Sequence, residues 1–176
     1  MPPEPSSPAP SDDLERLYDA HAAALFAWVL SITQNESDCR DVLQEVFARI
    51  AIRPGLLAGV RDERAFLLRL AKNTAFDLRR RRSAREKYHA ALAGETPLFQ
   101  ESPNPDEAAF RRALSEALAG LPPEQRAVVH LKLWEEATFE EIAEILGIPA
   151  NTAASRYRYA LDKLRARLRP LYDEIV

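Results

Sequence analysis

Residues 138–168 read TFEEIAEILGIPANTAASRYRYALDKLRARL. Thr138, followed three residues later by Glu141, is the pattern of a capping box, in which both side chains bind free backbone N–H groups at a helix start. Apolar residues at helical spacing come next, and Gly147 stands where that helix would end in a left-handed conformation. Pro149 then restricts the entry to a second helix. The stretch therefore predicts two helices separated by a tight turn.

The second of these helices presents polar and basic side chains on its first two turns, namely Asn151, Thr152, Ser155, Arg156 and Arg158. Two helices at a steep angle, the second with hydrogen-bond donors near its N-terminus, form the arrangement that reads bases in the major groove. We therefore predict a DNA-binding helix-turn-helix. The alternative is a packed helical hairpin whose polar residues merely face water.

The composition predicts an all-α protein. The 176 residues are 47% hydrophobic, contain only 5 Gly, and are dominated by Ala, Leu, Glu and Arg, which are good helix formers. No stretch alternates apolar and polar residues beside turn signals for long enough to predict a sheet. We expect two small helical domains joined by a flexible linker, the second domain containing the helix-turn-helix.

Helical periodicity recurs along the first half of the chain, in Leu14–Ile32, around Val42–Ile50 and from about Asp62 into a run of arginines. Three helices of this length can bury a small core of their own. Residues 92–105 then change to Pro-rich polar sequence, which is typical of a linker. The predicted divisions are a disordered tail (1–10), a first domain (11–91), a linker (92–105) and a second domain (106–176).

The sequence also indicates the cellular compartment of the protein. The single Cys39 cannot form an internal disulfide, which fits a reducing cytoplasm. The Pro-rich start lacks the basic and apolar regions of a signal peptide, and no apolar stretch is long enough to cross a bilayer. We expect a cytoplasmic protein with no membrane insertion.

The net charge of −3 conceals separate patches of opposite sign. Basic residues gather between Arg69 and Lys87 and again between Arg156 and Arg169, whereas acidic residues gather elsewhere, including the segment around Asp41. Phosphate is attracted by the local field rather than by the net charge. This distribution predicts two DNA contacts and a different partner for the acidic side.

On the second helix, Asp38, Asp41 and Glu45 share one face at three- and four-residue steps, with Gln44 beside them. An acidic face with neighbouring apolar residues suits a basic partner helix. The alternative is a face that is simply solvated.

The third helix contains FLLRLAKNTAFDLRRRR, residues 66–82. Such a helix can lie along a phosphate backbone while Asn73 and aromatic side chains receive an unstacked base. The alternative is that the arginines end the helix at its negative pole, where cations are favourable.

Together these motifs resemble the bacterial sigma factors of the extracytoplasmic-function (ECF) type, over nearly all of residues 11–170. DVLQEVF (41–47) resembles the surface of region two that binds the β′ coiled coil of RNA polymerase. FLLRLAKNTAFDLRRRR resembles the segment that melts and reads the minus-ten element. LPPEQRAVVHLKLWEEATFEEIAEILGIPANTAASRYRYALDKLR (121–165) resembles region four, which reads the minus-thirty-five element.

The resemblance implies roles for individual residues. The core-polymerase interface would comprise Asp38, Asp41, Gln44, Glu45 and Phe47. The minus-ten side would be contacted by Arg69, Lys72, Asn73, Asp77, Arg79, Arg80, Arg81 and Arg82, with Asn73 on the melted strand. The upstream element would be contacted by Asn151, Thr152, Ser155, Arg156 and Arg158. The implied partners are core RNA polymerase and promoter DNA, and the linker would permit an anti-sigma factor to clamp between the domains.

Two other classes of protein are the alternatives to this interpretation. A stand-alone helix-turn-helix regulator would use its first domain for dimerisation or sensing. An enzyme is disfavoured because His21, His89 and His130 lack metal-ligand spacing and no Gly-rich phosphate loop is present. We therefore expect no catalytic residue, metal site or cofactor, and we interpret Trp28 and Trp134 as core aromatics.

Overall fold

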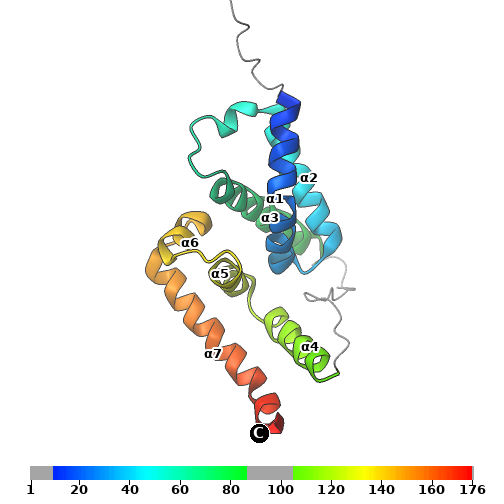
Figure 1. The fold of residues 1–176 in the computed structure, drawn as a ribbon, viewed down its shortest axis with the longest axis vertical. Coiled ribbons are helices and arrows are strands. Elements are labelled where there is room, and N and C mark those ends of the chain that lie inside the picture. Colours follow the sequence, from blue (N-terminus) through cyan, green and yellow to red (C-terminus); the bar gives the residue numbers. More distant parts are fainter. Residues whose placement is uncertain (1–9, 87–104, 176) are drawn as a thin grey trace, which may run out of the picture.

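The computed structural model describes residues 10–86 and 105–175, which form seven α-helices and one short 3-10 helix (Figure 1). The all-α prediction is confirmed, with no strand among these residues. None of the described helices is long and apolar enough to span a bilayer. His89, residues 1–9 of the predicted tail and residues 92–104 of the predicted linker lie outside the described ranges.

The first three helices, α1 (Pro10–Thr33), α2 (Glu36–Ile52) and α3 (Glu63–Glu86), pack against one another, and we call them block one. The side chain of Asn35 caps α2 by accepting a 3.0 Å hydrogen bond from the backbone N–H of Asp38. A short 3-10 helix, η1 (Pro54–Leu57), follows α2. This short helix separates α2 from α3.

The indole of Trp28, on α1, lies in the buried core beside α3. Its side chain is completely buried, and Nε1 donates a 3.1 Å hydrogen bond to the carbonyl oxygen of Leu68 on α3. A buried Trp needs such a partner for its N–H. The prediction that Trp28 is a core aromatic is confirmed.

The remaining helices, α4 (Pro105–Ala119), α5 (Pro123–Leu133), α6 (Phe139–Leu146) and α7 (Ala150–Ile175), form block two. Helices α6 and α7 are the predicted helix-turn-helix. Both hydrogen bonds of the capping box are present between Thr138 and Glu141, and Gly147 ends α6 in the left-handed conformation with φ 67°. The capping box therefore begins α6, and Gly147 ends it, as the sequence predicts.

Replacing Thr138 with Ala is expected to lower the free energy of unfolding by about 1 kcal/mol, because the backbone N–H of Glu141 loses its acceptor. Urea unfolding followed by circular dichroism measures the change. Thr138→Ser is the matched control because it keeps the hydroxyl, and it should stay close to wild type. Equal losses in the two variants would show that the Thr methyl group, and not the cap, stabilises α6.

The expectation that Trp134 is a core aromatic is wrong. Trp134 is 47% exposed, and its ring stacks on the buried imidazole of His130 at a centroid distance of 5.4 Å. Trp134 follows the last residue of α5, so one face of its ring covers His130 while the rest meets solvent. An apolar ring at a helix end can thus cover a core without entering it.

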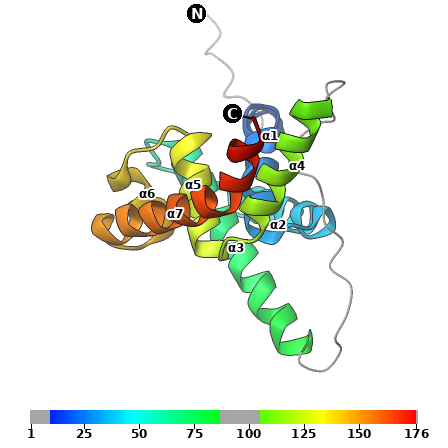
Figure 2. The same ribbon diagram turned by 90° about the horizontal axis from the view of Figure 1, so that it is seen from below.

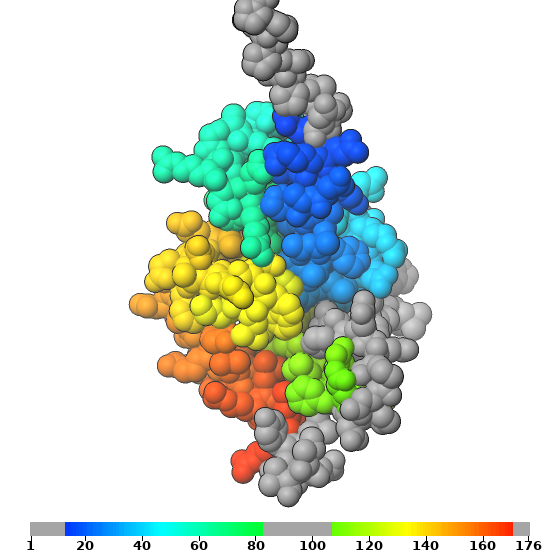
Figure 3. All heavy atoms as spheres, in the orientation of Figure 1, coloured from blue at the N-terminus to red at the C-terminus, as the bar shows by residue number. Residues whose placement is uncertain are grey.

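The two blocks are not separate in this structure. Helix α1 packs against α5, and α3 packs against α6. One continuous cluster of buried apolar side chains includes Leu67 and Ala71 from α3 together with Val128 and Leu131 from α5. Figure 3 shows block one in direct contact with the α5–α6 part of block two. A smaller second cluster lies between α4, α5 and α7.

Candidate nucleic-acid interface

The acidic face of α2 is largely open to solvent. Asp41 and Gln44 are exposed, and Glu45 is half-buried and paired with Arg49 one turn along. Phe47 is only 8% exposed, and its ring lies 4.9 Å from that of Tyr18 on α1. The predicted polymerase face therefore consists of exposed polar groups beside a buried aromatic, and it lies on α2, which packs on α1, α3 and η1.

Asp38 lies apart from that face. Its side chain is 5% exposed and forms an ion pair with Arg82 near the end of α3. The structure thus joins one residue predicted for polymerase binding to one predicted for DNA binding. The helical spacing that groups Asp38 with Asp41 could not reveal this pair, because Arg82 belongs to a different helix, α3.

The predicted minus-ten residues lie along α3, whose C-terminal end projects away from the other helices (Figure 2). Asn73, Arg69, Arg80 and Arg81 are exposed, while Thr74 is buried and donates a 3.1 Å hydrogen bond to the carbonyl of Leu70. Of the remaining predicted residues, Asp77 pairs with Arg80 at 3.0 Å, and Arg79 is half-buried. Exposed arginines on a projecting helix are available to phosphates.

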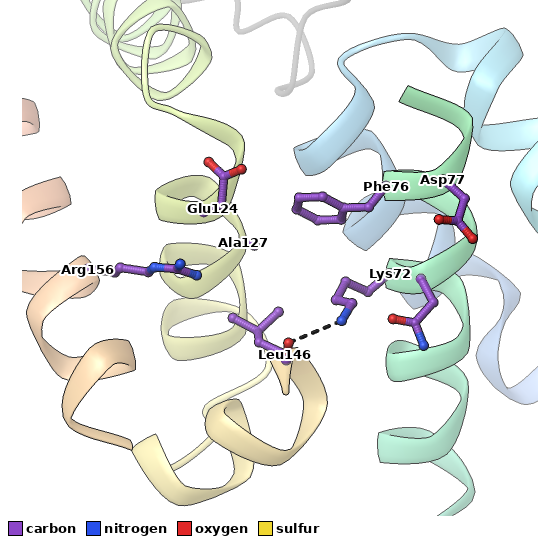
Figure 4. A pocket seen from close by; sticks show the side chains of 8 residues that line it. Lys72, Phe76, Asp77, Glu124, Ala127, Leu146 and Arg156 are labelled. Atoms are coloured by element: carbon purple, nitrogen blue, oxygen red, sulfur yellow. Dashed lines mark hydrogen bonds between the residues drawn. The ribbon is translucent and has the colours of Figure 1, made fainter. Parts of the chain in front are cut away.

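Lys72 is in a different position from the other cations of α3. It is half-buried, and Nζ donates a 3.1 Å hydrogen bond to the carbonyl of Leu146, the last residue of α6 (Figure 4). Burial, with a smaller effect of Arg69, lowers the pKa of the Lys72 ammonium. The amine of Lys72 therefore contacts the helix-turn-helix in this structure.

The predicted recognition residues lie on the first turns of α7. Asn151 and Arg158 are exposed, whereas Thr152, Ser155 and Arg156 are partly covered. The hydroxyl of Ser155 donates a 3.0 Å hydrogen bond to the carbonyl of Thr152 within the same helix. The face is therefore only partly accessible in this arrangement.

A cavity of about 510 Å³ lies between α3 and the helices of block two (Figure 4). Its walls are Lys72, Asn73, Phe76 and Asp77 from α3, Glu124 and Ala127 from α5, Leu146 from α6, and Arg156 from α7. The structure thus brings residues predicted for the minus-ten side and for the upstream element to the walls of one cavity.

Sequence reasoning did not single out Arg126, which joins the two blocks. Its guanidinium donates to the carbonyls of Ser31 (2.7 Å) and Ile32 (3.2 Å) at the end of α1. It also donates to the carbonyls of Ala119 (2.7 Å) and Leu121 (2.6 Å) within block two. The residue is 6% exposed, and burial, with a smaller effect of Arg79, lowers its pKa to about 10. Arg126 is therefore still a cation at neutral pH, and it lies at the negative end of α1.

A second missed pair also spans the blocks. Arg64 of α3 forms an ion pair with Glu135, whose side chain is 6% exposed and lies 3.7 Å from Nε2 of His130. The neighbouring His130 and the charge of Arg64 lower the pKa of Glu135. A signal for Arg126 exists in the sequence, since it precedes the apolar run AVV in α5, but its partners on α1 are more than ninety residues away in the chain.

Comparison with known proteins finds one family match in each block. Residues 17–85 match the family Sigma-70 region 2, and residues 117–166 match Sigma-70, region 4. The structure of RpoE in complex with the anti-sigma factor NepR from Bartonella quintana has a similar fold. It gives a TM-score of 0.72 at 19% sequence identity, covering 89% of this chain and 97% of that chain. CnrH, solved with the cytosolic domain of CnrY, gives a TM-score of 0.64 at 25% identity, covering 91% and 90%.

Similar sequences belong to one class of protein. The chain is 34% identical over 160 residues to the ECF RNA polymerase sigma factor SigL of Mycobacterium tuberculosis, covering 90% of each. It is 31% identical over 144 residues to the ferric citrate uptake sigma factor FecI of Escherichia coli, covering 78% of this chain and 80% of FecI. With both sigma regions present in order and such identity over nearly the full length, this chain is a member of the ECF family of RNA polymerase sigma factors.

Proposed function

We propose that this sigma factor docks on the β′ coiled coil of core RNA polymerase through the exposed face of α2 and acts in the cytoplasm. As a member of its family it directs transcription initiation and is not an enzyme. The main support for this docking site is that Asp41 and Gln44 are exposed on a helix whose opposite side is buried in block one. An exposed acidic strip beside aromatic groups is complementary to a basic helix.

We assign the DNA contacts to two helices. The exposed arginines of α3 would bind the backbone of the melted minus-ten strand, with Asn73 near an unstacked base. The first turns of α7 would enter the major groove at the minus-thirty-five element, where each good bidentate base contact discriminates by about 1–3 kcal/mol. The matches to both sigma regions do not favour the alternative of a stand-alone regulator.

The test of this function is reconstituted transcription. The purified chain is added to bacterial core RNA polymerase with fragments of bacterial genomic DNA, and the 5′ ends of the transcripts are sequenced. We expect transcripts that depend on the chain and share two upstream sequence elements at constant spacing. A housekeeping sigma factor is the positive control, and binding to duplex DNA without any polymerase-dependent transcript would contradict the proposal.

Neutralising two arginines of α3, Arg80→Gln with Arg81→Gln, is expected to weaken binding of the holoenzyme to a promoter with a pre-melted minus-ten region. Each lost contact to single-stranded phosphate reduces the slope of log K against log salt by about 0.7, so the double variant should lose about 1.4. Anisotropy titrations at several salt concentrations measure this slope. The Arg80–Asp77 pair is exposed, so its loss costs the fold little.

The matched control for this variant is Arg111→Gln with Arg112→Gln, two adjacent arginines on α4, one of them also paired with an acid in its own helix. It removes the same charge from a different surface. If the control reduces the slope as much as the α3 variant does, the effect reports net charge and not a contact made by α3.

An anti-sigma factor is the third partner that we propose, because the RpoE structure with a similar fold contains one. A protein that co-purifies with the chain from its source cells would be added to the reconstituted transcription reaction. We expect it to suppress the transcripts that depend on this chain and to leave those of the housekeeping sigma factor unchanged. Suppression of both would identify a general inhibitor.

A further inference from the structure

An ion pair between Asp38 and Arg82 joins two helices of block one that have different proposed roles. Asp38 lies in the first turn of α2, which carries the proposed polymerase face, and Arg82 lies near the end of α3, which is proposed to bind the minus-ten strand. Oδ1 of Asp38 and Nη2 of Arg82 are 2.5 Å apart. A role for this pair in promoter binding rests on the function proposed above.

The acidic partner of this pair is buried. The side chain of Asp38 is 5% exposed and that of Arg82 is 41% exposed, whereas both members of the Glu36–Arg40 pair at the start of α2 are open to solvent. An exposed ion pair contributes little, but removing one partner of a buried pair leaves a desolvated charge behind. The Asp38–Arg82 pair therefore constrains its two helices more strongly than an exposed pair would.

The pair lies where α3 leaves the core. Leu78, one turn before Arg82, is partly buried and packs against the core cluster, while Arg80 and Arg81 are exposed. Past this point the end of α3 projects away from the other helices (Figure 2). Segments with few buried contacts open locally at low cost. The contact at Arg82 extends the attachment of α3 by one turn beyond Leu78, and so it holds the segment that contains Arg80 and Arg81.

The burial of Asp38 does not fit the direct roles that the family resemblance implies for these two residues. A carboxylate on a side chain that is 5% exposed offers little surface to a polymerase helix, and the guanidinium of Arg82 is already paired. We propose that Asp38 and Arg82 are positioning residues, whose pair holds the end of α3 in the orientation in which Arg80 and Arg81 meet the melted DNA strand. Breaking the pair lowers the fraction of molecules with this orientation, and the apparent affinity for DNA falls by the same factor.

Asp38→Asn gives the first test, because positioning and simple electrostatics predict opposite results. Removing a negative charge by itself leaves the affinity for phosphate equal or makes it tighter. Loss of the pair should instead weaken binding of the holoenzyme to a promoter with a pre-melted minus-ten region by about fivefold. The variant is saturated with core polymerase before DNA is added, so that the titration measures the DNA step alone.

Arg82→Gln gives the second test, through the salt dependence of the same titration. It should lose about the same factor in affinity with the slope of log K against log salt unchanged, because the bound state keeps its phosphate contacts. A direct contact of Arg82 with phosphate would instead reduce the slope by about 0.7. The double variant should bind no more weakly than either single variant, since both remove one shared interaction.

The orientation of α3 can also be followed without polymerase or DNA. A nitroxide spin label is attached at Arg81→Cys, an exposed position beside the pair. The native Cys39 is buried, and burial raises its pKa to about 11, so its thiol reacts slowly with the label. The mobility of the label, measured by electron paramagnetic resonance, should rise in Asp38→Asn and in Arg82→Gln.

The matched control is Glu36→Gln. Glu36 is also an acid in the first turn of α2 and also pairs with an arginine, but its partner Arg40 belongs to α2 itself. This variant removes the same charge from the same helix end, and it should change neither the mobility of the label nor the affinity for DNA.

A second control separates positioning from a general loss of stability. Asn35→Ala removes the cap of α2 and keeps the ion pair, so it should lower stability in urea without weakening DNA binding. Arg82→Gln leaves the buried Asp38 charge in place, and circular dichroism checks whether that variant folds. If it does not, Asp38→Asn decides the question, because a partly exposed Arg82 can reach solvent.

Unchanged label mobility in Asp38→Asn would overturn the proposal, as would an equal response of Glu36→Gln or a slope reduced by about 0.7 in Arg82→Gln. Weaker polymerase binding by Asp38→Asn, with unchanged DNA binding by its saturated holoenzyme, would return Asp38 to the docking face. Failure of the sigma function is a separate result. In that case the wild-type chain forms no holoenzyme that binds the promoter, whatever the label shows.

Discussion

Asp41→Arg combined with Glu45→Arg is expected to abolish binding to core RNA polymerase, raising Kd by about a thousandfold or more. Reversing a charge at a complementary interface replaces an attraction with a like-charge contact, which costs several kcal/mol. Two such changes lie one turn apart on the exposed side of α2. The fold should tolerate them, because Asp41 is exposed and the Glu45–Arg49 pair is a partly exposed contact within one helix, worth about 0.5 kcal/mol.

Anisotropy of dye-labelled chain titrated with core polymerase measures this loss. Glu15→Arg with Asp19→Arg is the matched control, since these two acids are also exposed, also four residues apart and also in block one, but on α1. It changes the net charge by the same amount and should keep most of the affinity. Equal losses in both double variants would show that polymerase senses the charge of the whole chain and does not dock on α2.

Trp28→Ala is expected to have the largest effect on stability, lowering the free energy of unfolding by about 3–5 kcal/mol. The substitution empties a completely buried site and leaves the carbonyl of Leu68 without its indole partner. The ring also lies 5.3 Å from that of His130 on α5, so both blocks lose packing. A domain of ordinary stability has only about 5–15 kcal/mol in total, so the variant should be largely unfolded at modest urea concentrations.

The chain offers its own control in Trp134→Ala. This removes the same side chain from a position that is 47% exposed, and the expected loss is about 1 kcal/mol. Comparing the urea midpoints of the two variants tests the assignment of Trp28 to the core. Equal midpoints would mean that burial of Trp28 between the blocks contributes nothing special to folding.

The helix ends and the helix-turn-helix could be predicted from the sequence because their causes are local. The capping box of Thr138 and the left-handed Gly147 depend on residues at most a few positions away, and both are present in the structure. Periodic apolar residues likewise predicted each helix of block one. Residues close in sequence stay close in space, so short-range chemistry is sufficient for these features.

The sequence predicted only in part which of the proposed binding residues lie together on an exposed face. Spacing along α2 grouped Asp38 with Asp41, but Asp38 is buried and pairs with Arg82 of α3. The interpretation of Trp134 as a core aromatic is wrong, because Trp134 lies at the end of α5 and is 47% exposed. A periodic pattern shows which residues share a side of a helix, and it does not show which neighbouring helix covers that side.

By itself, the sequence determined the all-α class, the order of the helices and the chemistry that each helix offers to polymerase or DNA. Only the tertiary structure decided that the two blocks share a core and that Arg126 and Lys72 bond across it. The physical reason is the separation along the chain between the residues that interact. A helix forms from hydrogen bonds between residues four apart. The carbonyls that Arg126 and Lys72 bind across the two blocks belong to residues more than seventy positions away, and only packing brings them together.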